Sequence, residues 1–142
     1  MIATITLRVN YSETDQMGVV YHANYLVWFD RARTEFLRER GLTYRELELD
    51  GFYLAVSEVK VRYRAPARYD DVLTLETRVL NQRTSMIRFG YRLLREIAGK
   101  DPVLLAEGET VHVVVDRAMQ KTAMPERFAA ALRALGGVHA QS

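Results

Sequence analysis

The distribution of hydrophobic patterns along the chain is the feature that most constrains its fold. One helical pattern stands near the N-terminus, and most of the chain from residue 52 to residue 116 is strand-like. A period of two places side chains on alternate faces of a strand, whereas apolar residues three and four positions apart mark one face of a helix. This order predicts an α+β fold in which one long helix covers one antiparallel sheet.

The long helix is predicted to begin near Ala23 and to run for about 17 residues. Its apolar face is formed by side chains at helical spacing, which are Tyr25, Phe29, Ala32 and Phe36. Charged residues, Arg33 among them, are expected on its solvent surface. Asn24 is a candidate N-cap, with a start one or two residues earlier left open, and Gly41 is the expected stop.

Five strands are predicted from the alternation of apolar and polar residues. The polar segment between the helix and the second strand is assigned no element. The strands cover residues 2–9, Phe52–Arg64, Val72–Leu80, Ser85–Glu96 and Val103–Asp116, with turns at 81–84 and 98–102 and a final helix, Glu126–Leu135, ended by Gly136 and Gly137. One helix covers only part of such a sheet, and its edge strands need protection, so a dimer joined sheet edge to sheet edge is expected.

Composition narrows the classes of function. A length of 142 residues suits one domain over residues 1–142, and 20 basic against 18 acidic side chains give a net charge of only +2. No basic block is present, so no nucleic-acid partner is expected. The absence of Cys excludes thiolate nucleophiles and Cys-ligated zinc, and the scattered His22, His112 and His139 predict no metal site. With no signal-peptide pattern and no apolar run long enough to span a bilayer, a cytoplasmic location is expected.

The segment from Tyr11 to Tyr25 is the strongest candidate for a functional site. It joins the first strand to the long helix and crowds Tyr, Asp, His and Asn before the helix start. Helix N-termini offer unpaired N–H groups that can hold a carbonyl oxygen as it gains negative charge. A nearby carboxylate, Asp15, could attack that carbonyl or activate a water, and Gly18 would permit a tight turn.

A purely structural interpretation of the same residues stays open at this point. Asp15 can be an ordinary loop carboxylate, His22 a satisfied structural histidine, and Asn24 a helix cap. Tyr11, Tyr21 and Tyr25 can all be packing residues.

A longer pattern across the loop and helix favours the functional interpretation. The run Tyr11-x-x-x-Asp15-x-x-Gly18-Val19-Val20-Tyr21-His22-Ala23-Asn24-Tyr25, followed by Arg31-Ala32-Arg33-Thr34-Glu35, closely resembles the YbgC-like acyl-CoA thioesterases. These belong to the 4-hydroxybenzoyl-CoA thioesterase branch of the hotdog-fold superfamily. The resemblance extends to Tyr63, Pro66, Ala67 and the Asp70-Asp71 turn, and it covers roughly residues 5 to 130.

The resemblance implies a fold, an activity and a set of roles. The hotdog fold wraps a curved five-stranded antiparallel sheet around one long helix, and it forms homodimers and often homotetramers with active sites at the dimer interface. Members hydrolyse acyl-CoA to a carboxylic acid and CoA with no metal or other cofactor. The positions that match catalytic ones are Asp15, His22 and Tyr11, and the positions expected to contact substrate are Gly18, Tyr21, Asn24 and Tyr25.

Other functions on the same fold remain as alternatives. One is a hydratase or dehydratase that acts on acyl thioesters. Another is a non-catalytic scaffold, or a protein that binds acyl thioesters or acyl carrier protein. An acyl carrier protein is also retained as a possible partner of the enzyme.

Overall fold

A computed structural model describes residues 1–134 and 140–141 of the chain. Its sheet has the strand order β1-β3-β4-β5-β2, and all pairs along this path are antiparallel. The strands are β1 (Ala3–Arg8), β2 (Tyr53–Tyr63), β3 (Val72–Arg83), β4 (Met86–Arg95), β5 (Val103–Val115) and β6 (Ala140–Gln141), and the helices are η1 (Tyr11–Glu13), α1 (Asn24–Arg38), α2 (Tyr44–Leu49) and α3 (Glu126–Arg133). The predicted α+β architecture with a five-stranded antiparallel sheet is confirmed.

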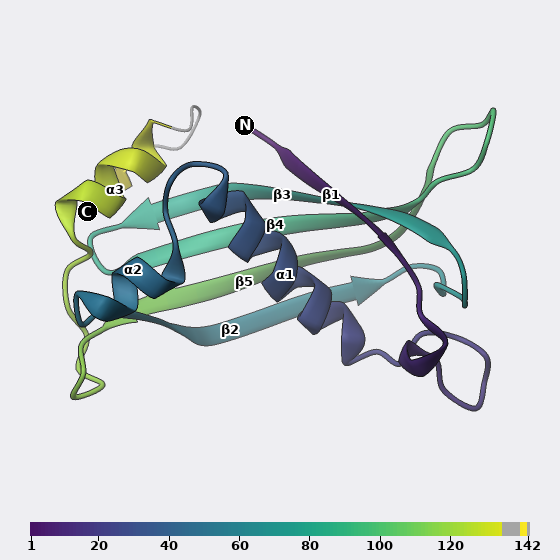
Figure 1. Cartoon of the computed structure of the whole chain (residues 1–142), viewed down its shortest axis with the longest axis horizontal. Helices are drawn as coiled ribbons and strands as arrows, with labels where there is room; N and C mark the ends of the chain where they lie inside the picture. Colours follow the sequence, from purple (N-terminus) through teal and green to yellow (C-terminus); the bar gives the residue numbers. More distant parts are fainter. Residues whose placement is uncertain (135–139, 142) are drawn as a thin grey trace.

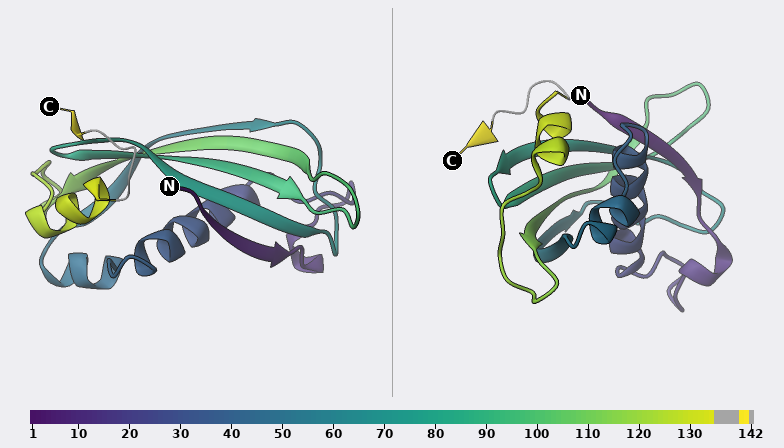
Figure 2. Two further views of the ribbon diagram at one scale, coloured as in Figure 1. Left: turned by 90° about the horizontal axis from the view of Figure 1, so that it is seen from above. Right: turned by 60° about the vertical axis from the view of Figure 1, so that its left-hand side comes forward.

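Helix α1 lies across one face of the sheet, which curves around it (Figures 1 and 2). Phe29 and Phe36 of α1 are fully buried, and the Phe29 ring stacks on Tyr91 of β4 with 4.3 Å between ring centroids. The strand opposite Tyr91 carries Gly108, directly beneath the Phe29 ring. The helix therefore seats in the sheet at a position where β5 has no side chain.

The two ends of α1 test the predicted caps. The helix begins at Asn24, and its N-cap is Ala23, so Asn24 is the first helical residue rather than the cap. It ends at Arg38, and Gly41 follows with φ +74°, while Leu42 N–H donates to the Leu37 carbonyl. This left-handed glycine confirms the predicted stop.

The predicted turn at residues 81–84 is wrong, because β3 continues through Arg83. Arg83 pairs with Met86 and Gln82 with Ile87, which leaves a two-residue turn at Thr84 and Ser85. The Gln82 side chain is buried and donates to the Ala129 carbonyl of α3. Strand β3 thus continues through a buried polar residue whose amide N–H is bonded to a helix from the other end of the chain.

Two elements at the same end of the sheet were not predicted. Helix α2 lies within the polar segment after α1, and Thr43 caps it by accepting from Glu46 N–H at 3.1 Å. Strand β6 pairs in parallel with β3. Helix α3 matches the predicted C-terminal helix as far as Arg133. The predicted stop at Gly136 and Gly137 lies outside the described residues.

The packing of Phe29 on Gly108 predicts that alanine destabilises the fold more at Gly108 than at Gly90. A Cβ added at Gly108 would lie 2.5 Å from Cε2 of the buried Phe29, so Gly108→Ala should lower the free energy of unfolding by about 1–3 kcal/mol. A Cβ at Gly90, on the neighbouring strand, would meet the Leu80 side chain at 2.9 Å. Leu80 is 42% exposed and can move aside, so Gly90→Ala should cost less than about 1 kcal/mol. Urea unfolding of both variants measures the difference, and equal costs would contradict this packing.

Candidate active site

The loop between β1 and α1 forms a short hairpin beside the start of α1 (Figure 1). Thr14 and Val20 form an isolated antiparallel bridge, and Asp15 N–H donates to the Val19 carbonyl at 2.9 Å. Val20 N–H donates to the Ala67 carbonyl at 2.8 Å, which ties the hairpin to the segment after β2. The loop is therefore held by the backbone on both sides.

Asp15 sits at the turn of this hairpin. Its Oδ1 accepts the Met17 N–H at 2.9 Å, and its carbonyl accepts the Gly18 N–H at 3.0 Å. Gly18 has φ +78°, a left-handed value that favours glycine. Within the described part of the chain the half-buried Asp15 forms no salt bridge, and its Oδ2 accepts no hydrogen bond.

The start of α1 supplies free backbone donors. The amides of residues 24–26 donate to the carbonyls three residues earlier, at 2.9–3.3 Å. Within residues 1–134 and 140–141, the amides of His22 and Ala23 donate no hydrogen bond. These two amides are the candidates to hold a carbonyl oxygen.

Tyr25 and Tyr63 hold the start of α1 in place through hydrogen bonds and ring contacts. Tyr63 O–H donates to the His22 carbonyl at 3.1 Å, and its ring lies 4.9 Å from that of Tyr25. Tyr25 is 3% exposed and stacks on Trp28, and its hydroxyl oxygen accepts the Ala67 N–H at 3.4 Å. Burial raises the pKa of both tyrosines, so both stay protonated at neutral pH. Tyr25 thus supports the site from within the core.

Three further predicted residues, Tyr11, Tyr21 and His22, lie on the same loop and are exposed, whereas Asn24 is half-buried at the start of α1. Tyr11 is 77% exposed and packs edge to face on Tyr69, while the His22 ring lies 4.5 Å from that of Tyr21. No hydrogen bond joins Asp15 to Tyr11 or His22 in the described residues. The structure therefore brings the predicted residues to one region, and no hydrogen bond joins their side chains within the described residues.

Glu13 is the site residue that the sequence interpretation missed. Its carboxylate accepts from Asn10 N–H and from Trp28 Nε1–H, each at 2.7 Å, and its carbonyl accepts from Asn24 Nδ2–H at 2.8 Å. The spacing Asn10-x-x-Glu13 is that of a capping box, a signal readable from the sequence. The contact with Trp28, fifteen residues away, has no such local signal.

A buried polar network lies under the middle of α1. Arg33, expected on the solvent surface, is instead 7% exposed. Its guanidinium donates to the hydroxyl oxygens of Tyr44 at 3.0 Å and Tyr91 at 3.1 Å, and to Asp30 at 2.6 Å. Burial raises the pKa of Tyr44 to about 12, although Arg33 opposes the shift. Arg33 is buried because it has three oxygen partners.

His112 ends this network and is a core residue. Its Nε2 lies 2.9 Å from Thr110 Oγ1, which in turn lies 2.7 Å from the Tyr91 hydroxyl. Burial, with a smaller contribution from the charge of Arg33, lowers the pKa of His112 to about 3. The neutral imidazole is 1% exposed and packs edge to face on Phe89, so it is enclosed in the core.

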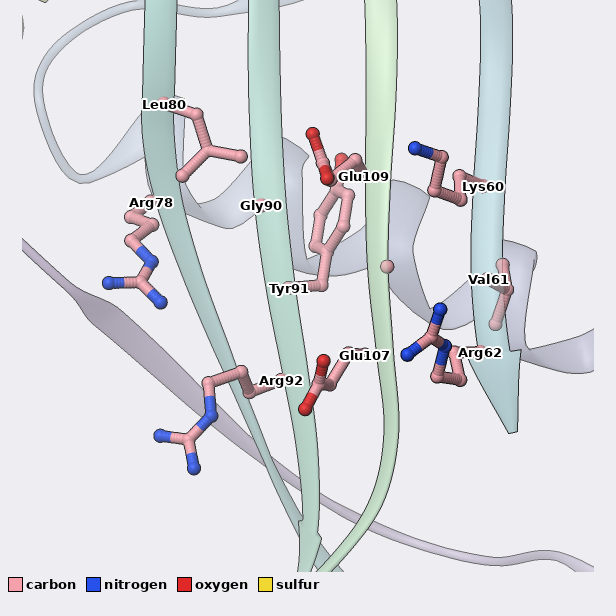
Figure 3. Close-up of a pocket in the computed structure, with 11 residues that line it drawn as sticks. Lys60, Val61, Arg62, Arg78, Leu80, Gly90, Tyr91, Arg92, Glu107 and Glu109 are labelled. Carbon is pink, nitrogen blue, oxygen red and sulfur yellow. The ribbon is translucent and has the colours of Figure 1, made fainter. Parts of the chain in front are cut away.

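The outer face of the sheet, away from α1, carries a hollow of about 570 Å³. Figure 3 shows basic and acidic side chains around it, among them Arg62, Arg78 and Glu107. Cross-strand ion pairs at 3.1–3.2 Å neutralise part of this charge, and they are Arg64–Glu107, Arg88–Glu109 and Arg92–Glu76. The hollow is lined by no histidine, serine or threonine, and it lies on the face of the sheet away from α1, whereas the Asp15 loop leads into α1 (Figure 2). It is therefore not the candidate active site.

Two further properties bear on function. Among the described residues, no group of three or more His, Asp or Glu side chains is placed to hold a metal ion. A search of the same residues finds no helix that is long and apolar enough to cross a membrane.

Comparison with known proteins gives a consistent result. A family model for the thioesterase-like superfamily matches residues 9–132. The acyl-CoA thioester hydrolase YbgC of Escherichia coli is 37% identical over 125 residues, which cover 87% of this chain and 90% of that protein. A crystal structure of a hypothetical protein from Thermus thermophilus has a TM-score of 0.85 and 38% identity, and the match covers 95% of this chain and 98% of that one. A 4-hydroxybenzoyl-CoA thioesterase has a TM-score of 0.83 at 21% identity over 92% of this chain and 98% of that one, a likeness of fold.

The sheet wrapped on one helix, with a carboxylate loop at the helix start, defines a hotdog-fold protein of the thioesterase type. The chain belongs to the thioesterase-like superfamily. The predicted resemblance to the YbgC-like thioesterases is thereby confirmed.

The left-handed glycines allow a matched test of the Asp15 turn. Gly18 and Gly99 both have positive φ, +78° and +73°, and both face open space. Alanine at either position should cost a similar amount of stability, about 1 kcal/mol, because each must adopt a left-handed conformation. Only Gly18→Ala should also lower thioesterase activity, because it displaces Asp15. Equal activity of the two variants would contradict the placement of Asp15 by this turn.

Proposed function

We propose that the chain hydrolyses acyl-CoA thioesters to carboxylic acid and CoA, with Asp15 as the catalytic carboxylate. The observation that carries the proposal is the pairing of two features on one loop. A carboxylate with one oxygen uncommitted lies at its turn, and the free amides of His22 and Ala23 lie at its end. The proposal is further supported by the family, since the YbgC relative is named an acyl-CoA thioester hydrolase.

In the proposed reaction the thioester carbonyl oxygen accepts from the amides of His22 and Ala23. Asp15 takes a proton from water as the water oxygen bonds to the carbonyl carbon, and the amides stabilise the oxyanion that forms. The oxyanion then re-forms the carbonyl as the C–S bond breaks and the CoA thiolate leaves. In the alternative route Asp15 itself attacks, and water hydrolyses the resulting mixed anhydride to the same products.

The remaining loop residues receive supporting roles in this proposal. Gly18 shapes the turn that presents Asp15, and Asn24 and Tyr25 fix the first turn of α1. Tyr11, Tyr21 and His22 are exposed on the loop that carries Asp15, and in this proposal they contact the substrate or the attacking water. Their exposure in a single chain supports a site that is completed by another surface.

We infer that this surface belongs to a second copy of the chain, aligned along β2. Strand β2 is one edge of the sheet, and its exposed positions include Val56 and Val59, at 51% and 43%. Its last residue, Tyr63, bonds to the His22 carbonyl, so the strand edge leads directly to the site. A second copy paired there would cover an open strand edge and the Asp15 loop together. A tetramer would be two such dimers.

The wider assignments are also proposals. The described residues share one hydrophobic core, which supports a single domain over the chain. We retain a cytoplasmic location as a proposal. An acyl carrier protein could supply thioesters for the same reaction, so it is proposed as an additional substrate donor. A panel of short, long and aromatic acyl-CoA and acyl-carrier-protein thioesters, read by free thiol release, ranks these substrates. A scaffold would release no thiol from any of them, and a hydratase would instead form an enoyl product from a 3-hydroxyacyl thioester.

Asp15→Asn keeps the size of the side chain and removes its charge, so it should lower kcat for acyl-CoA hydrolysis by about 10²–10⁴-fold. Asp116→Asn is a matched control. Its Oδ1 accepts the Ala118 N–H at 2.8 Å, as Asp15 Oδ1 accepts the Met17 N–H, yet it lies at the other end of the sheet. The control should keep its activity. Wild-type activity in purified Asp15→Asn would remove the basis of the mechanism.

The proposed dimer predicts that a charge on the β2 edge disrupts both assembly and activity. Val59→Glu should yield monomers in sedimentation velocity and lower activity, since an unpaired carboxylate in a strand-pairing interface is costly. Leu80→Glu alters an aliphatic side chain of similar exposure, 42%, on the outer face of β3. That variant should keep the dimer. An active, monomeric Val59→Glu would show that one chain suffices.

A further inference from the structure

We propose that Glu13 is a positioning residue for thioester hydrolysis, which sets the distance between Asp15 and the free amides at the start of α1. The inference rests on the proposed role of Asp15. It adds a residue that neither the sequence pattern nor the family relationship assigns.

The carboxylate of Glu13 joins two distant parts of the chain. Oε1 accepts the Asn10 N–H and Oε2 accepts the Trp28 indole N–H, each at 2.7 Å. Trp28 is 2% exposed, so its indole N–H is a buried donor that needs a partner. One side chain thus connects the segment before the loop to the second turn of α1.

The carbonyl of Glu13 makes the corresponding connection to the helix start. It accepts the Tyr21 N–H at 2.9 Å and the Asn24 Nδ2–H at 2.8 Å. These two donors flank the free amides of His22 and Ala23. The position of the proposed oxyanion site is therefore fixed on both sides by bonds to one residue.

Glu13 also lies at the base of the hairpin that carries Asp15. Asp15 follows it by two residues, and the bridge between Thr14 and Val20 closes the hairpin immediately beyond it. Glu13 thus fixes the position of the Asp15 carboxylate and of the free amides of His22 and Ala23. In reactions of oriented groups, a displacement of about 1 Å can cost up to about 10²-fold in rate.

The hydrogen-bond pattern requires a carboxylate. Both oxygens of Glu13 accept from N–H donors, whereas an amide has only one accepting oxygen and presents N–H at the other. Glu13→Gln therefore keeps the shape but loses one bond and sets two donors against each other.

Glu13→Gln should lower kcat about 10- to 100-fold while KM for acyl-CoA stays within about threefold, because orientation changes more than binding. Glu46→Gln is the control. Glu46 lies on α2, away from the loop, and its carboxylate pairs with Arg127 of α3 at 3.0 Å. Its kcat should match the wild type. A residue that acted only on stability would lower the melting temperature without this separation of kcat from KM.

Trp28→Phe supplies an independent test, because it removes the donor and keeps Glu13. Alone it should lower kcat with little change in KM. Added to Glu13→Gln it removes the donor–donor conflict, so the double variant should have a kcat no lower than Glu13→Gln. If the two single-variant losses in kcat multiplied in the double variant, the proposal would be overturned. If Glu13→Gln does not fold, the kcat of Trp28→Phe alone still tests the contact.

The fluorescence of Trp28 gives a readout that needs no substrate. The chain contains one Trp, so emission reports the surroundings of Trp28, in which Glu13 accepts the indole N–H. Glu13→Gln should shift the emission maximum and Glu46→Gln should not. Wild-type kcat and emission in Glu13→Gln, with Asp15→Asn inactive, would refute the positioning role and leave the proposed function intact. An active Asp15→Asn would instead refute the proposed function itself.

Discussion

The packing of α1 into the curved sheet is the interaction on which the rest of the structure depends. Phe29 enters the sheet where Gly108 leaves room and stacks on Tyr91, which anchors the helix between β4 and β5. Once the helix is anchored, its first turn must fall beside the end of β2, where Tyr63 O–H bonds to the His22 carbonyl. The proposed site therefore depends on where a core helix begins, and its donors are the free amides of His22 and Ala23 immediately before the first helical residue.

The interior between α1 and the sheet is partly polar, and its hydrogen-bond network stabilises the core. Arg33 is buried but is satisfied by two tyrosines and Asp30, and His112 is held neutral by its environment. A buried group with shifted pKa is a common sign of an active site. Here the groups with shifted pKa lie in the core, whereas Asp15, the carboxylate proposed to react, lies in a half-buried turn.

Much of the fold was predictable because its signals are local and periodic. The long helix, the five strands and the left-handed Gly41 follow from apolar spacing and from residue chemistry alone. The errors fall where distant contacts decide. Gln82 lies within β3, where its amide N–H donates to a carbonyl of α3, and Arg33 is buried because Tyr91, far along the chain, accepts its hydrogen bond. At the site, residue pattern identified the loop, but the link from Glu13 to Trp28 and the choice of free amides required the structure.

The central claim is that a thioester carbonyl lies between Asp15 and the amides of His22 and Ala23. A crystal structure of the protein with a non-hydrolysable acyl-CoA analogue, its carbonyl retained, tests this most directly. We expect the carbonyl oxygen about 3 Å from at least one of the two amide nitrogens, with the Asp15 carboxylate beside the carbonyl carbon. An analogue whose carbonyl lies on the outer face of the sheet, or out of reach of Asp15, would contradict it.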